Sequence, residues 1–336
     1  MDFKAIYAPT ISRNVMKLSQ FILCYLLVFI NTNLATELPG VSTLLLETPF
    51  SAKHTQQVLA GKITTTDIVP VSKNELAQGV ACLVKNDAQI NLDTIRKGTW
   101  LAPEQHILLS SLIAENATLT DFEAIRFNAQ NEQELQRFID AEAGRELNLS
   151  AQEISEFAKL KQAQNNHLDV QSTELLIQNI LLNRYQQYRK QGLKGVPPYA
   201  RGDNKHTQPE TQLQTSLEES LGLKKLYPQL YSLLKDYPQD INDTVIEDYY
   251  WYLVNLGDRP AIGLSHRVFS NSGAATLQIE RGYYISHTLD SVQVFVGLIP
   301  VKEGTLLLYI NRTWTEEISG LFSFIKRKIA HKIMLS

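Results

Sequence analysis

Cysteine is scarce in this chain, with only 2 among 336 residues, and this scarcity excludes a scaffold held together by disulfides. Cys24 lies in an apolar stretch near the N-terminus, and Cys82 lies alone in the strand-like run GVACLVK. A single cysteine in an apolar strand is usually a small core residue. Because nothing nearby in the sequence would lower the pKa of this thiol, we do not expect Cys82 to be a nucleophile.

An excess of either charge is also missing. The chain has 32 lysine and arginine residues against 35 aspartate and glutamate residues, so its formal net charge is −3. No basic run with interleaved aromatic residues supplies the surface that neutralises phosphates in nucleic-acid binders. We interpret the most basic stretch, residues 326–332, as the solvated face of a helix, and we predict no nucleic-acid partner.

The motifs of metal, nucleotide and nucleophile chemistry are absent from the sequence. It has no H-E-x-x-H, no paired C-x-x-C, no Walker loop and no G-x-G-x-x-G, and GLSHR at residues 263–267 lacks the last glycine of a nucleophile elbow. Four scattered histidines show no two-histidine spacing on one face: His54, His106, His167 and His206. We therefore predict no metal site and no cofactor.

Long hydrophobic runs are limited to the N-terminal region. Arg13 and Lys17 precede the apolar residues 21–30, and a plausible cleavage point follows Ala35, so we predict a signal peptide over residues 1–35. A retained N-terminal anchor is the alternative interpretation. No later run reaches the roughly 18 apolar residues of a membrane span. The prediction is an exported protein, periplasmic or extracellular, with no transmembrane span after the signal peptide.

The remaining residues, 36–336, read as a single α+β domain in three parts. The first part, 40–127, contains helices and a hairpin, because KITTTDIVPV and AQGVACLVK are β-branched, alternating runs separated by a turn. The second part, 128–240, is a helical insertion rich in Gln, Glu, Ala and Leu. The third part, 241–336, is a β-meander followed by a C-terminal helix.

The meander carries polar residues on a face that should point inward. Period-two alternation places seven residues of the strand 277–289 on one face: Leu277, Ile279, Arg281, Tyr283, Ile285, His287 and Leu289. Arg281 and His287 would lie about 20 Å apart along this strand, so each needs its own partner. The next strands, 292–299 and 305–311, are apolar at nearly every position, which is typical of a sheet covered on both faces or wrapped around a cavity.

The chain closes with a predicted amphipathic helix. Thr313 and Glu316 have the spacing of a capping box. The apolar stripe of this helix comprises Ile318, Leu321, Phe322, Ile325, Ile329 and Ile333. The whole pattern predicts a curved antiparallel sheet packed on a long C-terminal helix.

Five residues of the meander are the candidate ligand-binding residues: Arg281, Tyr283, Tyr284, His287 and Arg312. A buried guanidinium must be paired, so Arg281 requires a ligand's acid group or one of the carboxylates Glu247, Asp248 and Asp258. A structural ion pair for Arg281 is the alternative. If the register were flipped, the cavity would instead be lined by Glu280, Tyr284 and Ser286.

Several strings of the sequence resemble a set of exported bacterial proteins to which no activity is assigned. These strings are PPYARG at 197–202, DYP at 236–238, the meander RGYYISHTLDSVQVFVGLIPVKEGTLLLYINRT and the N-terminal hairpin. The order of elements is also similar to the helix-grip layout of START-type lipid-binding domains. That resemblance implies an apolar cavity between the sheet and the C-terminal helix.

Three functions follow as hypotheses. The first is a non-enzymatic exported protein that binds an apolar or amphipathic, lipid-like small molecule, because an apolar pocket with a few polar groups is the usual ligand site. The second is an enzyme whose acid/base group is His287, with Tyr284, Asp290 or Arg312 as partners and with His266 as a further candidate. The third is an envelope structural or interaction protein that docks through the basic last helix or the aromatic run 249–252.

Overall fold

A large antiparallel sheet organises the computed structural model, which describes residues 37–85, 96, 107–127, 132–165, 167–239, 245–256 and 259–316. The chain divides into two compact units at residue 38, and the sheet belongs to the unit Pro39–Ser336. The predicted signal peptide and the predicted last helix beyond residue 316 lie outside the described residues.

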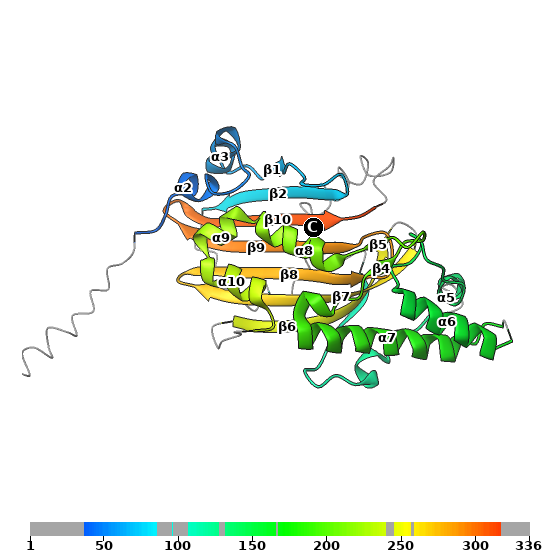
Figure 1. The fold of residues 1–336 in the computed structure, drawn as a ribbon. Helices are drawn as coiled ribbons and strands as arrows, with labels where there is room; N and C mark the ends of the chain where they lie inside the picture. The colour runs from blue at the N-terminus through cyan, green and yellow to red at the C-terminus, as the bar shows by residue number, and fades with distance from the viewer. Residues whose placement is uncertain are drawn as a thin grey trace, which may run out of the picture. The chain divides into compact units, whose positions relative to one another are not determined.

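Among the described residues the sheet has eight strands in the order β1-β2-β10-β9-β8-β7-β6-β3 (Figure 1). Every neighbouring pair is antiparallel, which confirms the predicted α+β class with an antiparallel sheet. The strands are β1 Thr64–Asp67, β2 Glu75–Val84, β3 Ile107–Leu112, β6 Val245–Leu256, β7 Arg259–Ser272, β8 Ala275–Ile285, β9 Ser291–Val301 and β10 Gly304–Trp314.

The predicted N-terminal hairpin is present as β1 and β2, and β2 alternates between buried and half-buried residues as its sequence indicates. The predicted meander is present as β6 to β10. The two pieces join because β2 pairs with β10 along its whole length, with Glu75 opposite Trp314 and Val84 opposite Thr305. This pairing extends the meander with strands from the other end of the chain.

Helices lie over one face of the sheet, and α8, α9 and α10 cross it in Figure 1. The helices are α2 Val41–Leu45, α3 Ala52–Leu59, α5 Glu132–Ile139, α6 Ala151–Ala163, α7 Val170–Gln191, α8 Pro209–Glu218, α9 Leu221–Leu226 and α10 Pro228–Asp236, with the 3-10 turns η2 Leu119–Phe122 and η4 Gly192–Gly195. A small hairpin, β4 Tyr199–Ala200 and β5 His206–Thr207, interrupts them. Ser150 and Glu153 form a capping box that begins α6, and the predicted helical character of the middle is confirmed.

Two apolar clusters fill the space between the sheet and these helices, and we call that side of the sheet the helix face. One cluster joins α7 to β6 and β7, through residues such as Tyr185 and Trp251. The other joins α8, α9 and α10 to β8, β9 and β10, through residues such as Leu234 and Leu277. A third cluster, which includes Val292, Val294, Val296 and Tyr309, lies on the opposite face, the far face. β9 is thus buried on both sides, which is one of the two alternatives that its apolar sequence left open.

A β-bulge corrects the predicted alternation of β8. Leu277, Ile279, Arg281 and Tyr283 share the helix face as predicted, but the pairing of β7 with β8 shifts between Leu264 and Ser265. The extra residue places both Tyr283 and Tyr284 in the helix-face cluster and turns Ile285 into the far-face cluster. The prediction that Ile285 continues the face of Tyr283 was therefore wrong.

The predicted start of the last helix is also corrected. Thr313 belongs to β10, where it pairs with Leu76 and Val292, and its hydroxyl donates to Asn311 Oδ1 at 2.8 Å. Thr313 is therefore not the N-cap of a helix, because the sheet ladder continues through it. The longest helix that the structure describes is α7, in the middle of the chain.

Candidate functional site

A row of polar side chains crosses the helix face of five neighbouring strands. Tyr249, His266, Arg281, Gln293 and Arg312 stand directly opposite one another, from β6 to β10. All five are buried, with exposed fractions of 5% or less. The register thus brings two predicted site residues, Arg281 and Arg312, into one row, which we call the polar row.

His266 connects a tyrosine to a carboxylate at one end of the polar row. Its Nδ1 lies 2.9 Å from the Tyr188 hydroxyl, and its Nε2 lies 2.7 Å from Glu247 Oε1. Burial lowers the pKa of His266, so the ring is neutral at pH 7, although Glu247 opposes this effect. Because the carboxylate only accepts, Nε2–H donates to Glu247 and Nδ1 accepts from the Tyr188 hydroxyl.

Arg281 occupies the middle of the polar row with few hydrogen bonds. Its Nε donates to Gln293 Oε1 at 3.4 Å, whereas Nη1 and Nη2 are buried without a hydrogen-bond partner in the described structure. Of the predicted carboxylates, Glu247 accepts from His266 and Asp248 forms a bidentate pair with Arg96, while Asp258 lies outside the described residues. Within the described part of the chain, no carboxylate forms an ion pair with Arg281.

The guanidinium of Arg281 acts electrostatically on Tyr188. Burial raises the pKa of Tyr188 to about 12, and the positive charge of Arg281 opposes that rise. Tyr188 also stacks on Tyr283, with ring centroids 4.0 Å apart, and the Tyr283 hydroxyl is buried without a partner among the described residues. Tyr283 is therefore an apolar wall beside Arg281 rather than a hydrogen-bonding group.

Tyr284 lies in a different environment from Tyr283. The Arg184 guanidinium stands 4.2 Å from the centre of the Tyr284 ring and pairs with Glu153 at 2.6 Å. The bulge explains this separation, because it directs two consecutive tyrosines to two parts of the same face. Arg184 and Glu153 come from α7 and α6.

His287 is buried in the turn that follows β8 and is held by hydrogen bonds to nearby groups. Its Nε2–H donates to the Pro260 carbonyl at 3.1 Å, and its Nδ1 accepts from the Thr288 hydroxyl at 2.8 Å. Burial lowers the pKa of His287. In the described structure it makes no hydrogen bond with its proposed partners, because Tyr284 lies against Arg184, Asp290 pairs with Arg201, and Arg312 pairs with Glu75.

Three of the four aromatic residues 249–252 are buried in the core, and Tyr250 is half-buried. Tyr249 and Trp251 lie on the helix face, and Tyr252 belongs to the far-face cluster. Their exposed fractions are 4%, 0% and 8%.

Burial raises the pKa of the Cys82 thiol, so that residue lacks the reactive thiolate of a nucleophile.

A hollow of about 280 Å³, which we call the apolar pocket, opens between β9, β10 and α9. Its floor is formed by helix-face residues of the two strands, and α9 with the turn before α3 forms the wall. The lining includes Phe295, Ile299, Leu308, Ile310, Arg312 and Leu226. Arg312 is the predicted site residue that reaches a pocket in the described structure.

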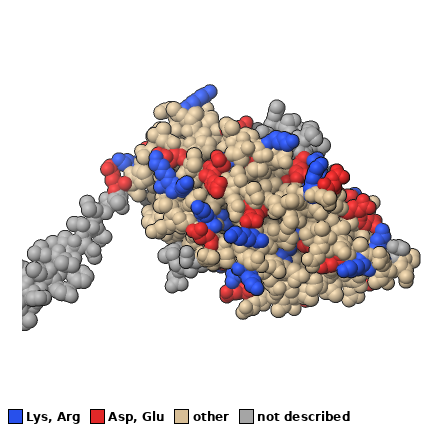
Figure 2. Space-filling view, viewed as in Figure 1, with Lys and Arg blue, Asp and Glu red and all other residues tan. Residues whose placement is uncertain are grey.

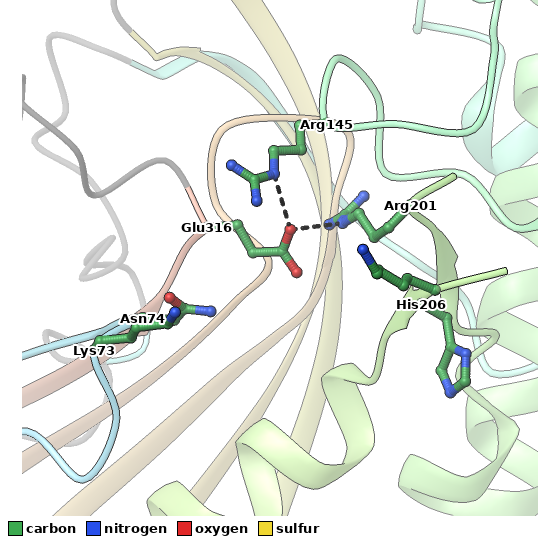
Figure 3. A pocket seen from close by; sticks show the side chains of 7 residues that line it. Lys73, Asn74, Arg145, Arg201, His206 and Glu316 are labelled. Atoms are coloured by element: carbon green, nitrogen blue, oxygen red, sulfur yellow. Dashed lines mark ion pairs between the residues drawn. The ribbon is translucent and has the colours of Figure 1, made fainter. Parts of the chain in front are cut away.

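A second hollow of about 700 Å³, the basic pocket, is lined by Lys73, Asn74, Arg145, Arg201, Lys205, His206 and Glu316 (Figure 3). On the face shown in Figure 2, basic and acidic side chains are interspersed. The gathering of basic residues in this pocket is therefore a local feature. None of its lining residues was a candidate ligand-binding residue from sequence.

The hydrogen bonds of Tyr188 and Glu247 to His266, and of Arg201 to Asp290, were not predicted from the sequence. Tyr188 lies 78 positions from His266, and Arg201 lies 89 positions from Asp290, so no local spacing joins either pair. The only available signal was the placement of His266 on an apolar strand, which indicates a buried group that needs partners.

Neither a membrane span nor a metal centre is found in the part of the chain that the structure describes. None of the described helices combines the length and apolar composition that a bilayer crossing requires. Within the described ranges, no group of three His, Cys, Asp or Glu residues is arranged to hold a metal ion. Comparisons of the chain with protein-family models, curated proteins and solved structures find no match.

Proposed function

We propose that this chain is an exported, non-enzymatic protein that binds a small amphipathic molecule in the apolar pocket. The observation that carries the proposal is a hollow of about 280 Å³ with an apolar floor and one arginine within it. Concave apolar sites with a few polar groups are the usual form of small-molecule sites. Small-molecule sites have volumes from roughly 300 Å³ upward. The apolar pocket lies at the lower end of this range, so the ligand, or the part of it that enters the pocket, is small.

Arg312 supplies the polar contact of the pocket. Its Nη1 donates to Glu75 Oε1 at 2.5 Å, and Glu75 also accepts from the Val71 amide at 2.8 Å. The other nitrogens of Arg312 donate to no atom of the described residues. Because Glu75 already balances the charge, these donors suit an uncharged oxygen on the ligand, such as that of an alcohol or an ester.

Apolar surface continues outward from the pocket. Leu46 and Leu221 line its mouth and are 76% and 65% exposed, which is unusual for large apolar side chains beside a cavity. An alkyl or ring portion longer than the pocket would lie on these residues. This continuity supports an amphipathic ligand with its polar end toward Arg312.

The helix-grip arrangement and export are parts of the same proposal. The apolar stripe predicted for residues 318–333 needs a surface to pack against, and the far-face cluster of Val292, Val294 and Val296 offers one. The resemblance to the helix-grip layout implied a cavity between the sheet and this last helix. The described pocket lies instead between the sheet and α9, and the proposal concerns that pocket.

The proposal is tested by a substitution that fills the apolar pocket with a larger side chain. Ile310→Trp adds a large ring to the half-buried floor, whereas Ile246→Trp makes the same change at a 40% exposed position of β6 outside the pocket. Native mass spectrometry of the protein from its own cells should find a bound small molecule on the wild type and on Ile246→Trp. Ile310→Trp should bind it at least about tenfold more weakly and carry clearly less of it, because excluding two methylene groups of the ligand removes about 1.6 kcal/mol, more than the ~1.4 kcal/mol of a tenfold change.

Two results would contradict the proposal. One is a wild-type protein that carries no small molecule and does not bind the fluorescent probe anilinonaphthalene sulfonate. The other is an unchanged bound mass on a correctly folded Ile310→Trp, which would place the ligand elsewhere. Thermal unfolding of both variants establishes that they are folded.

A further inference from the structure

The basic pocket is assembled from parts of the chain that are distant in sequence. Lys73 comes from the turn between β1 and β2, Arg145 from the segment between α5 and α6, and Lys205 from the β4–β5 hairpin. Figure 3 shows Arg145 and Arg201 directed toward the carboxylate of Glu316, which follows β10. Convergence of four segments on one hollow is typical of a binding site rather than of a solvated helix face.

The charges of this pocket are strongly unbalanced. Among the described residues that line it, four lysine and arginine side chains face one carboxylate, Glu316, and Arg201 also pairs with Asp290 behind the pocket, which leaves two positive charges in excess. Lys205 has only Asp203 nearby among the described residues, at 3.9 Å, and both side chains are more than three quarters exposed. Such an exposed pair contributes little, so Lys205 is available to another anion.

Glu316 shows how the pocket accepts an anionic group. Its Oε2 lies 3.3 Å from Arg145 Nε and 3.3 Å from Arg201 Nε, and its Oε1 accepts from the Thr207 hydroxyl. Arg145 is 67% exposed, so most of its guanidinium is free to meet a ligand. A carboxylate of the chain therefore occupies one part of the pocket and leaves Lys73, Lys205 and the outer edge of Arg145 unused.

Arg201 makes one wall of the pocket rigid. Its Nη1 donates to the Gly144 carbonyl at 3.0 Å, and its Nη2 donates to Asn148 Oδ1 at 2.7 Å and to Asp290 Oδ1 at 2.8 Å. The same residue closes the β4–β5 hairpin, because the Arg201 amide donates to the Lys205 carbonyl at 2.9 Å. The hairpin that presents Lys205 and His206 is thus fixed before any ligand arrives, which reduces the entropy cost of binding.

We propose that the basic pocket binds a small molecule that carries a phosphate group. A phosphate brings close to two negative charges and three acceptor oxygens, which match the unused donors of Arg145, Lys73 and Lys205. Glu316 competes with this ligand for Arg145. The basic pocket and the apolar pocket share no lining residue among those described. A failed test of one proposal therefore does not contradict the other.

The experiment titrates the full chain with inorganic pyrophosphate by calorimetry at low salt. The wild type should show saturable binding. Arg145→Gln combined with Lys205→Gln should weaken it at least about tenfold, because two charge-assisted contacts are removed. Glu316→Gln should strengthen it several-fold, because the competing negative charge is gone. Lys53→Gln, which removes a charge at an exposed position of α3, should leave it unchanged.

Three outcomes would overturn the proposal. The first is the absence of saturable binding by both the wild type and Glu316→Gln. The second is binding that the double variant retains at full strength. The third is an equal loss with Lys53→Gln, which would show a response to net charge alone. Because all substituted side chains except Glu316 are largely exposed, the variants should keep the wild-type thermal midpoint, and a second reading by phosphorus NMR does not depend on heat changes.

Discussion

At the scale of single residues, Tyr188 and Tyr283 allow one hydrogen bond to be isolated. Both rings are fully buried and stack on each other, but the Tyr188 hydroxyl donates to His266 and the Tyr283 hydroxyl has no partner among the described residues. Tyr188→Phe should lower the free energy of unfolding by about 1–3 kcal/mol, since it leaves a buried nitrogen unpaired. Tyr283→Phe should be neutral or slightly stabilising, because it removes only a desolvated hydroxyl. Urea unfolding measures both, and equal losses would contradict the assigned contacts.

At the scale of elements, the end of α7 depends on Gly192. Its φ is +62°, and an added Cβ would lie 2.3 Å from the Tyr237 carbonyl oxygen. Gly192→Ala should therefore cost clearly more than the ~1–2 kcal/mol of a left-handed backbone, because the ψ of −144° lies outside the left-handed helical region and the segment at Tyr237 must also move. Gly61→Ala is the control: its φ is +77°, but its Cβ would meet nothing within 4 Å. Chemical denaturation should show only the backbone cost for Gly61→Ala, and similar losses at both sites would refute the close approach of α7.

At the scale of the whole molecule, buried titratable groups set the response to acid. Burial lowers the pKa of His266 and His287 below the ordinary 6.5, so the unfolded chain takes up protons first and stability is lost as the pH falls below that value. Burial raises the pKa of Asp290 from 3.8 to about 6. Between about pH 6 and pH 3.8 the folded chain therefore binds a proton that the unfolded chain does not, so this group stabilises the fold as the pH falls through that range. Each proton is worth up to about 1.4 kcal/mol per pH unit.

On acidification the two histidines destabilise the fold and the one aspartate stabilises it. The effect of the two histidines is larger, so the free energy of unfolding should fall between about pH 7 and pH 5.5. His287→Gln should reduce this fall, because it removes one group that charges on unfolding. Asp290→Asn should enlarge the fall, because it removes the group that opposes it. Urea titrations at the two pH values measure these slopes, and a fall of the same size in all three proteins would contradict the assignment.

Local pattern predicted much of the fold. The alternation in TTTD and ELAQGVACLV predicted the first hairpin, and the apolar run of β9 indicated either burial on both faces or a cavity, of which the structure shows the burial. The bulge at Tyr283 and Tyr284 was not predictable, because a bulge depends on the partner strand β7 and leaves no mark in the alternation of β8. The partner of Arg281 was not predictable either, because Gln293 lies opposite it only once β8 and β9 are paired in register.

Of the two candidate pockets, one contains a residue that was selected from the sequence and the other contains none. Arg312 was selected from sequence as a polar residue near an apolar strand, and it reaches the apolar pocket. The basic pocket was not foreseen, because Lys73, Arg145, Lys205 and Glu316 are ordinary polar residues until four segments meet. Charges that are far apart in the chain make no detectable local pattern.

The sequence by itself determined the α+β class of the chain, its first hairpin, its helical middle and its meander, because hydrophobic periodicity is a local property. Only the tertiary structure decided that β2 completes the meander, that Tyr188, His266 and Glu247 meet beside Arg281, and that the apolar pocket and the basic pocket each gather described residues from distant segments. The physical reason is that strand pairing and helix packing between distant segments are selected by the burial and hydrogen bonding of the whole chain, which no short window contains.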